Sequence, residues 1–329
     1  MSATSLAPGS CWVVTDGAAG NRRQALALAE ALTPSIREIV VDLRAPWAWF
    51  APRLLPGSRL ALSRQAGGLR PPWPALVIGC GRAAAWATRQ VRDGSGGRTL
   101  AVQILDPRVG TDAWDLVVAP KHDQLHGDNV LTPLGSLNPV DDAWLADARE
   151  AFAEFGDLPG PRLGVLLGGP RHGGTMDAGE LAALLEGVKR RHASEGGSVM
   201  VLASRRTPSA LLPMVRAAVQ GMPGFFWAPG DDDPNPYPGV LGWADRLVVT
   251  ADSVNMLSEA CATGRPVHTL ATQPLPAKLE RFHAELRDTR RLHAIDASTP
   301  PVQPVLRETA WVAMRVREHL GLAAAYAST

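Results

Sequence analysis

Short apolar runs alternate with stretches in which apolar residues recur every three to four positions along nearly the whole chain. The runs are typical of buried parallel strands, and the spaced stretches are typical of helices that cover a sheet. The strands are expected at 11–15, 37–42, 75–79, 99–104, 115–118, 129–132, 163–167, 198–203, 224–227, 246–250 and 266–270. This alternation predicts βαβ units, and therefore an α/β fold with two doubly wound parallel sheets.

The expected helices lie between these strands. In the clearest one, 21–32, an apolar stripe is formed by Ala25, Leu28, Ala29 and Leu32. The other helices are expected at 141–155, 177–192, 208–220, 253–263, 276–290 and 305–320.

The stretch Gly156–Pro161 interrupts this pattern and is the predicted linker. A chain of 329 residues fits two domains better than a single core. We therefore expect one Rossmann-like domain at 1–157 and a second at 158–329, with the last helix packing back on the first domain.

Composition excludes several classes of function. Lys and Arg total 33 against 32 Asp and Glu, a formal net charge of +1, so no global field recruits nucleic acid. The cysteines, Cys11, Cys80 and Cys261, lack the spacing of a zinc site or a disulfide framework, which favours a reducing compartment. No signal-peptide pattern and no apolar run of membrane-spanning length is found, so we expect a cytoplasmic protein.

The most informative segment is Val248–Val267. Its β-branched start predicts a buried strand, and Asp252 or Ser253 supplies an N-cap oxygen for the helix that follows. Such a helix start directs its free N–H groups and positive dipole end toward the crevice above the sheet, where a pyrophosphate fits.

In that helix, Glu259 lies on the face shared with Asn255 and Met256. Its carboxylate can accept hydrogen bonds from ribose hydroxyls. An ordinary strand–helix–strand unit without a ligand is the alternative, because every α/β sheet contains such units.

The first strand-to-helix turn contains Gly17 and Gly20. It lacks the GxGxxG spacing of a dinucleotide site, and only Asp42 at the end of the second strand supports NAD binding. A turn without a ligand is the other alternative.

A second loop, opened by Gly168 and Gly169 and continued through Arg171, carries four glycines between a strand and a helix. Glycines allow backbone N–H groups to approach a bound anion, and Arg171 adds positive charge. A surface loop is the alternative.

A third strand ends at Ser204, followed by Arg205 and Arg206. Thr207 is expected to cap a helix whose first residue is Pro208. Either arginine is a suitable phosphate partner, although an exposed arginine pair is often only solvated.

Ionisable side chains gather after an apolar strand, at Lys121, His122, Asp123, His126 and Asp128. They can transfer protons near neutral pH. The pair of histidines lacks helical register and a third ligand, so no metal site is expected. An ordinary polar loop is the alternative.

The stretch Trp47–Leu55 is aromatic and apolar, and Arg44, Arg53 and Arg59 flank it. This pattern is typical of a peripheral contact with the inner membrane or of a groove for a lipid-linked acceptor. A buried cap over the first sheet is the alternative.

Several short segments form an ordered set across the chain. They are Gly17–Asn21, Gln24–Glu30, Gly168–Pro170, Ser204–Pro208, Asn235–Tyr237, Thr250–Met256, Ser258–Ala260, Gly264–Pro266, Lys278 and Phe282–His283. In this order they resemble the GT-B glycosyltransferases, and more closely the family of bacterial and plant proteins labelled mitochondrial fission (elongated-mitochondria) proteins.

The resemblance implies a GT-B-like fold in which two Rossmann-like domains face a cleft. The first domain binds an acceptor, and the second binds a nucleoside-diphosphate sugar, with UDP-type donors expected. The residues expected to contact this ligand are Gly17, Gly20, Asn21, Gly168, Gly169, Arg171, Ser204, Arg205, Arg206, Asp252, Ser253, Asn255, Met256, Ser258 and Glu259.

The first turn also resembles that of transferases that add N-acetylglucosamine to lipid-linked peptidoglycan precursors, in which a histidine is the candidate base. This chain has Asn21 there, and an amide cannot accept a proton at working pH. The catalytic base is therefore expected at Asp16, His122 or Asp123, or is absent.

The sequence thus predicts a metal-independent, glycosyltransferase-like enzyme that needs no cofactor besides its nucleotide-sugar substrate. Its acceptor is expected to be a lipid-linked or cell-envelope glycan. A nucleotide-sugar 2-epimerase is one alternative. A non-catalytic GT-B-like scaffold is the other, and Asn21 favours it.

Overall fold

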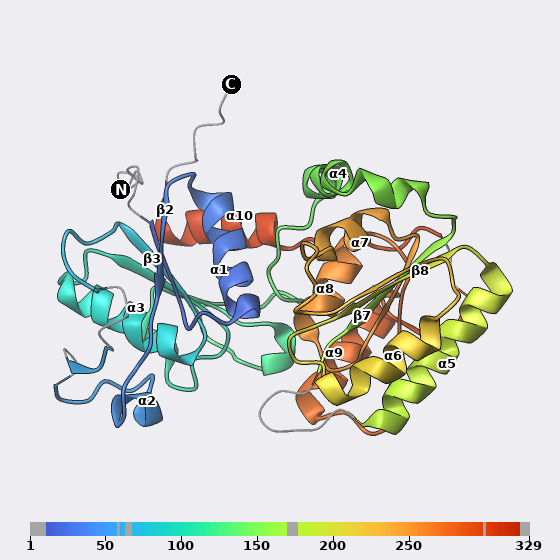
Figure 1. Cartoon of the computed structure of the whole chain (residues 1–329). Coiled ribbons are helices and arrows are strands. Elements are labelled where there is room, and N and C mark those ends of the chain that lie inside the picture. Colours follow the sequence, from blue (N-terminus) through green and yellow to red (C-terminus); the bar gives the residue numbers. More distant parts are fainter. Residues whose placement is uncertain (1–10, 58–59, 63–67, 170–176, 299–300, 323–329) are drawn as a thin grey trace. The chain divides into compact units, whose positions relative to one another are not determined.

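The computed structural model describes residues 11–57, 60–62, 68–169, 177–298 and 301–322. The chain forms two compact units, each built on its own six-stranded parallel sheet (Figure 1). The first unit comprises Met1–Pro139 and Arg307–Thr329, and the second comprises Val140–Leu306.

The sheet of the first unit has the strand order β2-β1-β3-β4-β5-β6, and all of its neighbours are parallel. Its strands are β1 (Cys11–Thr15), β2 (Ile36–Val40), β3 (Leu76–Cys80), β4 (Leu100–Ile104), β5 (Leu116–Val118) and β6 (Val130–Leu131). Since β2 and β3 lie on opposite sides of β1, the chain order reverses between β1 and β3. Ligands of open α/β sheets bind at the carboxyl ends of the strands at such a switch point.

Helices bury both faces of this sheet. They are α1 (Ala19–Leu32), α2 (Trp47–Phe50), α3 (Arg82–Gly94) and α10 (Thr309–Leu320). Alternate residues of β1 point to opposite faces, so Cys11 and Val13 pack with α1 and α10, whereas Trp12 and Val14 pack with α3. Figure 1 shows α10 in red beside α1 in blue, although they come from opposite ends of the chain.

The last helix is held in the first unit by its own N-terminus. The Glu308 carboxylate accepts hydrogen bonds from the N–H groups of Leu134 and Gly135, each at 2.9 Å. The Thr309 hydroxyl donates to the carbonyl of Asn138 at 2.7 Å. These hydrogen bonds tie the residues at the start of α10 to the 134–138 segment and so fix the position of the helix.

The sheet of the second unit has the strand order β12-β11-β10-β7-β8-β9. Its strands are β7 (Arg162–Leu167), β8 (Ser198–Ala203), β9 (Gly224–Trp227), β10 (Arg246–Val249), β11 (Val267–Thr269) and β12 (His293–Ala294). Here β8 and β10 lie on opposite sides of β7, which places the switch point between β7 and β10.

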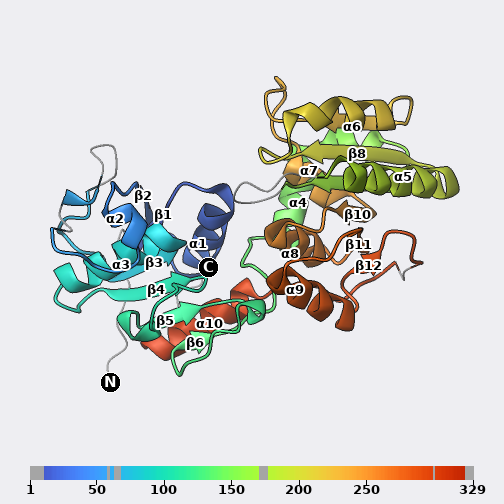
Figure 2. The ribbon, with the colours of Figure 1, turned by 90° about the horizontal axis from the view of Figure 1, so that it is seen from below.

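Helices also cover the second sheet. They are α4 (Asp142–Ala151), α5 (Ala178–Glu195), α6 (Leu212–Val219), α7 (Tyr237–Trp243), α8 (Val254–Ala262) and α9 (Ala277–Asp288). α5 and α6 lie side by side (Figure 2), and Leu184 and Val215 from them join one core cluster with Val165 of β7.

The contacts divide the chain at Pro139 rather than at the predicted boundary, residue 157. α4 packs on α7, where Arg149 donates to the carbonyl of Gly242 at 3.3 Å and accepts from the indole N–H of Trp243. The guanidinium of Arg162 donates to the carbonyl of Phe155 at 3.0 Å. The Gly- and Pro-rich stretch expected to be a linker is therefore bound to the second unit.

Most expected elements lie where the sequence places them, and β8 and β9 have the expected bounds. Two expected helices are shorter. The one at 141–155 ends as α4 before a 3₁₀ turn, and the one at 208–220 begins with a 3₁₀ turn before α6. Among the described residues, no helix is both long and apolar enough to cross a membrane.

Candidate functional site

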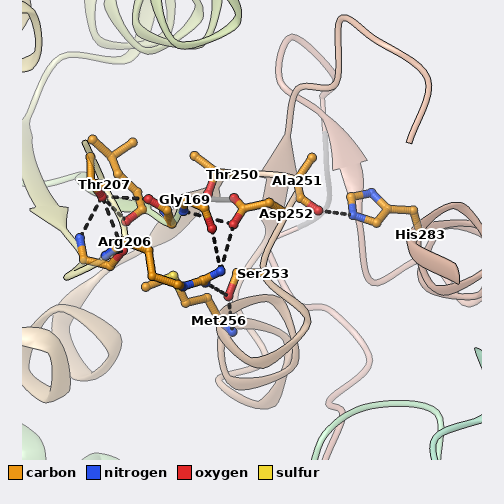
Figure 3. Close-up of polar contacts among 12 residues, drawn as sticks. Gly169, Arg206, Thr207, Thr250, Ala251, Asp252, Ser253, Met256 and His283 are labelled. Carbon is orange, nitrogen blue, oxygen red and sulfur yellow. Dashed lines mark hydrogen bonds and ion pairs between the residues drawn. The ribbon is translucent and has the colours of Figure 1, made fainter. Parts of the chain in front are cut away.

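Three loops meet at the carboxyl ends of β7, β8 and β10 in the second unit (Figure 3). They begin at Gly168, Ser204 and Thr250, respectively. Neighbouring parallel strands end at the same edge of a sheet, so most of the predicted nucleotide-binding residues of this unit come together here. The predicted Arg171 lies outside the described residues.

The N–H groups of the two glycines that open the first loop, Gly168 and Gly169, are hydrogen-bonded to other parts of the protein. The N–H of Gly168 donates to the hydroxyl of Thr250 at 2.8 Å, and the N–H of Gly169 donates to the carboxylate of Asp252 at 2.9 Å. A Cβ at Gly169 would overlap the backbone carbonyl of Arg206, and one at Gly168 would lie 2.7 Å from a carboxylate oxygen of Asp252. Glycine is thus required at both positions for the loops to pack, and both backbone N–H groups already have a hydrogen-bond acceptor within the protein.

Arg206 connects the three loops. One of its terminal nitrogens, Nη1, donates to the carbonyl of Gly169 and lies 3.4 Å from the Asp252 carboxylate. The other, Nη2, donates to the hydroxyl of Ser253 at 3.3 Å. Because the side chain stays partly exposed, the loop cluster presents one guanidinium at the edge of the sheet. The neighbouring Arg205 is exposed.

Ser204 and Thr207 shape the loop that carries these arginines. The N–H of Arg206 donates to the Ser204 hydroxyl at 3.2 Å, and the Thr207 hydroxyl lies 2.7 Å from the carbonyl of Gly168. Thr207 was expected to cap a helix. The helical turn after it has Pro208 at the cap position and no side-chain cap, so that prediction is wrong. The hydroxyl joins two loops instead.

The third loop leads into α8. As expected, the side chain of Ser253 caps this helix by accepting from the N–H of Met256 at 3.4 Å. Asn255 and Met256 are partly exposed in the first turn. Ser258 is buried, and its hydroxyl donates to the carbonyl of Val254 within the helix, so it lies away from the loop surface.

Glu259, predicted to accept hydrogen bonds from ribose, is buried. Its carboxylate accepts a hydrogen bond from the hydroxyl of Tyr237, which is buried as well. Tyr237 belongs to the Asn235–Tyr237 segment of the sequence. The structure therefore gives this carboxylate a protein donor at the position where a ribose hydroxyl was expected.

His283 supports the third loop through a hydrogen bond to the loop backbone, a role that the sequence did not reveal. This fully buried residue donates from Nε2 to the carbonyl of Ala251 at 2.8 Å (Figure 3). Burial lowers the pKa of His283, because a charged ring would lose its hydration, and the hydrogen bond to Ala251 opposes that effect in part. The neutral ring thus holds the backbone next to Asp252.

In the first unit, the turn after β1 forms a separate polar cluster. The amide of Asn21 donates to both carboxylate oxygens of Asp16, at 3.0 and 3.1 Å, and the N–H of Ala18 donates to the same carboxylate. Asp16 remains exposed. Gly17 has a left-handed φ of +79°, and Gly20 lies in the first turn of α1, which begins at Ala19.

Gly81, at the end of β3, completes this cluster. Its φ is +94°, and a Cβ there would lie 2.6 Å from the side-chain nitrogen of Asn21. The sequence did not single out Gly81. Its position after a strand and before a helix, as at Gly17, is the signal that could have identified it.

The other two candidate bases are buried. His122 and Asp123 lie in a short 3₁₀ turn after β5, each with its side chain only 2% exposed, and His122 Nε2 is 3.9 Å from Asp123 Oδ1. Among the three base candidates, Asp16 alone is exposed.

A surface pocket of about 330 Å³ opens beside Asp16. Its walls are Val40–Leu43 after β2, Ala48 and Ala51 of the α2 region, and Arg82–Ala83 at the start of α3. The walls are mostly apolar, and Asp16, Asp42 and Arg82 provide the charges. The pocket therefore suits a ligand that has both an apolar part and hydroxyl groups.

Comparison with known proteins gives a consistent result. A model of the family described as Mitochondrial fission ELM1 matches residues 19–320. The chain is 30% identical over 276 residues to the Mitochondrial fission protein ELM1 of Arabidopsis thaliana. That match covers 75% of this chain and 64% of the plant protein, so the chain spans less than two thirds of that relative.

Two similar solved structures are of UDP-GlcNAc 2-epimerase from Methanocaldococcus jannaschii. One has a TM-score of 0.54 at 13% identity and covers 95% of this chain and 92% of that one. The other, in complex with UDP-GlcNAc and UDP, has a TM-score of 0.51 at 12% identity with the same coverage. Identity this low shows the fold alone, and that fold is of the GT-B type, as predicted.

Proposed function

Because the chain belongs to the mitochondrial fission ELM1 family and has a GT-B fold, we propose that it binds a nucleoside-diphosphate sugar and transfers the sugar to an acceptor. The second unit binds the donor, with UDP compounds preferred. The first unit binds the acceptor, a lipid-linked or cell-envelope glycan.

Arg206 carries the donor part of this proposal. Its guanidinium is fixed by Gly169 and Ser253 and stays partly exposed beside the N-terminus of α8. A fixed guanidinium and the positive end of a helix dipole both favour a diphosphate. The site lies at the switch point between β7 and β10, where open α/β sheets bind ligands.

The same two groups can serve a displacement reaction. As the acceptor oxygen attacks the anomeric carbon, the bond from that carbon to the diphosphate oxygen breaks, and the electron pair leaves with the diphosphate. Arg206 and the N–H groups of α8 stabilise this developing charge without a metal ion.

Asp16 is the proposed base for the acceptor hydroxyl. It is exposed and borders the pocket of the first unit. The amide of Asn21 contacts both carboxylate oxygens and so orients the group without removing its charge. In this interpretation Asn21 positions the base and does not itself accept the proton.

The first test is calorimetric titration with UDP and UDP-GlcNAc, followed by the diphosphates of guanosine, adenosine and cytidine. Arg206→Gln should weaken diphosphate binding by about tenfold, the effect of one charge-assisted hydrogen bond. Arg190→Gln is the matched control, because Arg190 is an exposed arginine of the same unit that pairs with Asp296. It should leave the affinity within about twofold.

Failure of the wild-type protein to bind any of these nucleotides would overturn the proposal. Product analysis then separates the alternatives. Formation of the 2-epimer from UDP-GlcNAc without an acceptor identifies an epimerase. Donor binding without turnover, together with a stable protein partner, identifies a scaffold. Transfer that continues in EDTA supports the metal-independent mechanism.

A further inference from the structure

The segment from Leu43 to Leu62, which includes α2 (Figure 1), has one side anchored in the first unit. Ala51 and Ala61 are buried in the core cluster on the α3 face of the sheet, and Trp47 packs against that cluster. The indole N–H of Trp47 donates to the carbonyl of Pro56 at 3.2 Å. We refer to the described residues of this segment, 43–57 and 60–62, as the α2 arm.

Two arginines of α3 bind the backbone of the α2 arm. Arg82 donates to the carbonyl of Ala48 at 3.3 Å, and Arg89 donates to the carbonyl of Pro52 at 2.8 Å. These bonds tie the arm to the helix that follows β3. The described part of the arm is therefore a supported element.

Several large apolar side chains of the described part of the arm are exposed. Trp49 is 73% exposed, Leu60 is 68% exposed and Phe50 is 49% exposed. Val40, which precedes the arm and lines the pocket beside Ala48, is exposed as well. A folded protein gains stability by burying such groups, so the consecutive exposed residues Trp49 and Phe50 on a supported element indicate a binding surface.

The charge along this part of the sequence is strongly one-sided. Between Asp42 and Asp93 the sequence has no acidic residue, and it carries eight arginines within a chain whose formal net charge is +1. They are Arg44, Arg53, Arg59, Arg64, Arg70, Arg82, Arg89 and Arg92. Arg44 and Arg53, both in the arm, are exposed.

We propose that the α2 arm is a membrane-docking surface for anionic lipid. Trp49, Phe50 and Leu60 enter the boundary between headgroups and acyl chains, and Arg44 and Arg53 bind the lipid phosphates. Tryptophan is favoured at this boundary because its ring is amphipathic, and each arginine near an anionic leaflet adds attraction. A nucleic acid would be bound by the arginines but would leave Phe50 and Leu60 in water.

Docking is independent of the donor site in the second unit. It bears on the acceptor, because Ala48 and Ala51 of the α2 arm also line the pocket that contains Asp16. Docking the arm brings this pocket to the lipid surface. If the protein transfers a sugar as proposed, the acceptor is then a lipid with a hydroxylated headgroup, and only this statement about the acceptor rests on the proposed function.

The test is co-sedimentation of the full chain with phosphatidylcholine vesicles that contain or lack phosphatidylglycerol. The wild type should bind the anionic vesicles, with weaker binding at high salt because the arginines are screened. Trp49→Ser/Phe50→Ser should lower the partition coefficient by at least about tenfold, since it removes the inserted apolar surface. Arg44→Gln/Arg53→Gln should remove most of the preference for phosphatidylglycerol.

Trp311→Ser is the matched control, because Trp311 is a 42% exposed tryptophan on α10 of the same unit. The partition coefficient of this variant should stay within about twofold of the wild-type value, because it leaves the arm unchanged. Circular dichroism and UDP titration of every variant verify the fold and the donor site separately, so a failure of docking is distinguishable from a failure of the transfer function.

Three outcomes overturn the proposal. The first is that the wild type binds neither vesicle. The second is that the Trp49→Ser/Phe50→Ser variant binds as well as the wild type. The third is that single-stranded RNA displaces the vesicles and binds the double variant unchanged, which would make the arginines a nucleic-acid site.

Discussion

The two switch points have the same arrangement of strands, but the side chains and loops around them differ. In the second unit, the loops after β7, β8 and β10 close on one another through Arg206, Asp252 and Gly169. In the first unit, the turn after β1 leaves the Asp16 carboxylate exposed beside an open pocket. One site therefore presents a guanidinium paired with a carboxylate, and the other presents a carboxylate beside a pocket.

This comparison shows that a glycine at a strand end can serve loop packing and need not leave its N–H group open to a ligand. Gly168 and Gly169 are needed because other loops pack against them, and their N–H groups are already bonded. Gly81 is needed because its φ is positive and Asn21 lies against it. The predictions that follow test this difference, from the largest expected effect to the smallest.

Gly169→Ala should cost the most, about 3 to 5 kcal/mol of unfolding free energy, because its Cβ would overlap the rigid backbone carbonyl of Arg206. Urea denaturation of the second unit provides the measurement. Gly221→Ala in the same unit is the control, since Gly221 has φ +82° but nothing within 4 Å, and it should cost about 1 kcal/mol. Equal costs would mean that the loops separate easily and are not interlocked.

Acid should weaken the second unit through His268. Burial, the largest cause, lowers the pKa of this fully buried ring from 6.5 to about 4. Between those two pH values the unfolded chain binds the extra proton, so stability is complete above pH 6.5 and falls as the pH drops toward 4. The loss should be on the order of 3 kcal/mol.

Comparing denaturation of the wild type and His268→Gln across this pH range measures that loss. The variant should be less stable at pH 7, and its stability should depend less on pH between 6.5 and 4. If the unfolding free energy of the variant depends on pH as steeply as that of the wild type, groups other than His268 cause the acid sensitivity.

Gly81→Ala tests the first unit and should cost about 1 to 2 kcal/mol. The cost combines a positive φ of +94° with a contact of 2.6 Å to the end of the Asn21 side chain. In the double variant Gly81→Ala/Asn21→Ala the contact is gone, so the two effects should not be additive. Additive costs would show that Asn21 moves aside freely.

Asn21→Ala alone should have the smallest effect on stability, at most about 0.5 kcal/mol, because its bonds to Asp16 are exposed to water. The same variant should slow sugar transfer more than it weakens UDP binding, since it would release the base and leave the donor site intact. A stability loss above about 1.5 kcal/mol would indicate that this cluster holds the fold together.

Much of the fold was predictable because its signals are local. Apolar periodicity placed β8 and β9 at their observed bounds, and Ser253 caps α8 as expected. The short α7 was missed, because seven residues with two glycines carry little helical pattern. The predicted linker failed for a different reason, since only the folded chain shows Arg162 bound to the carbonyl of Phe155.

The candidate site was less predictable. The loops expected to bind the donor do lie together at one edge of the second sheet, and the sequence also placed Ser258 and Glu259 among the ligand contacts. Both are buried, and the carboxylate of Glu259 is bonded to Tyr237, which lies 22 residues away in the chain. No spacing rule within α8 indicates such a donor.

The amino-acid order alone determined the alternation of strands and helices, the two sheets and the polar loops at the strand ends, because these follow from short-range periodicity. Only the tertiary structure decided which polar groups of those loops are already bonded and which remain exposed. Gly168 donates to Thr250, 82 residues away, and Asp16 keeps its exposed carboxylate beside a pocket built from three separate segments. Hydrogen-bond partners and solvent exposure depend on which distant segments become neighbours, and that follows from the packing of the whole sheet.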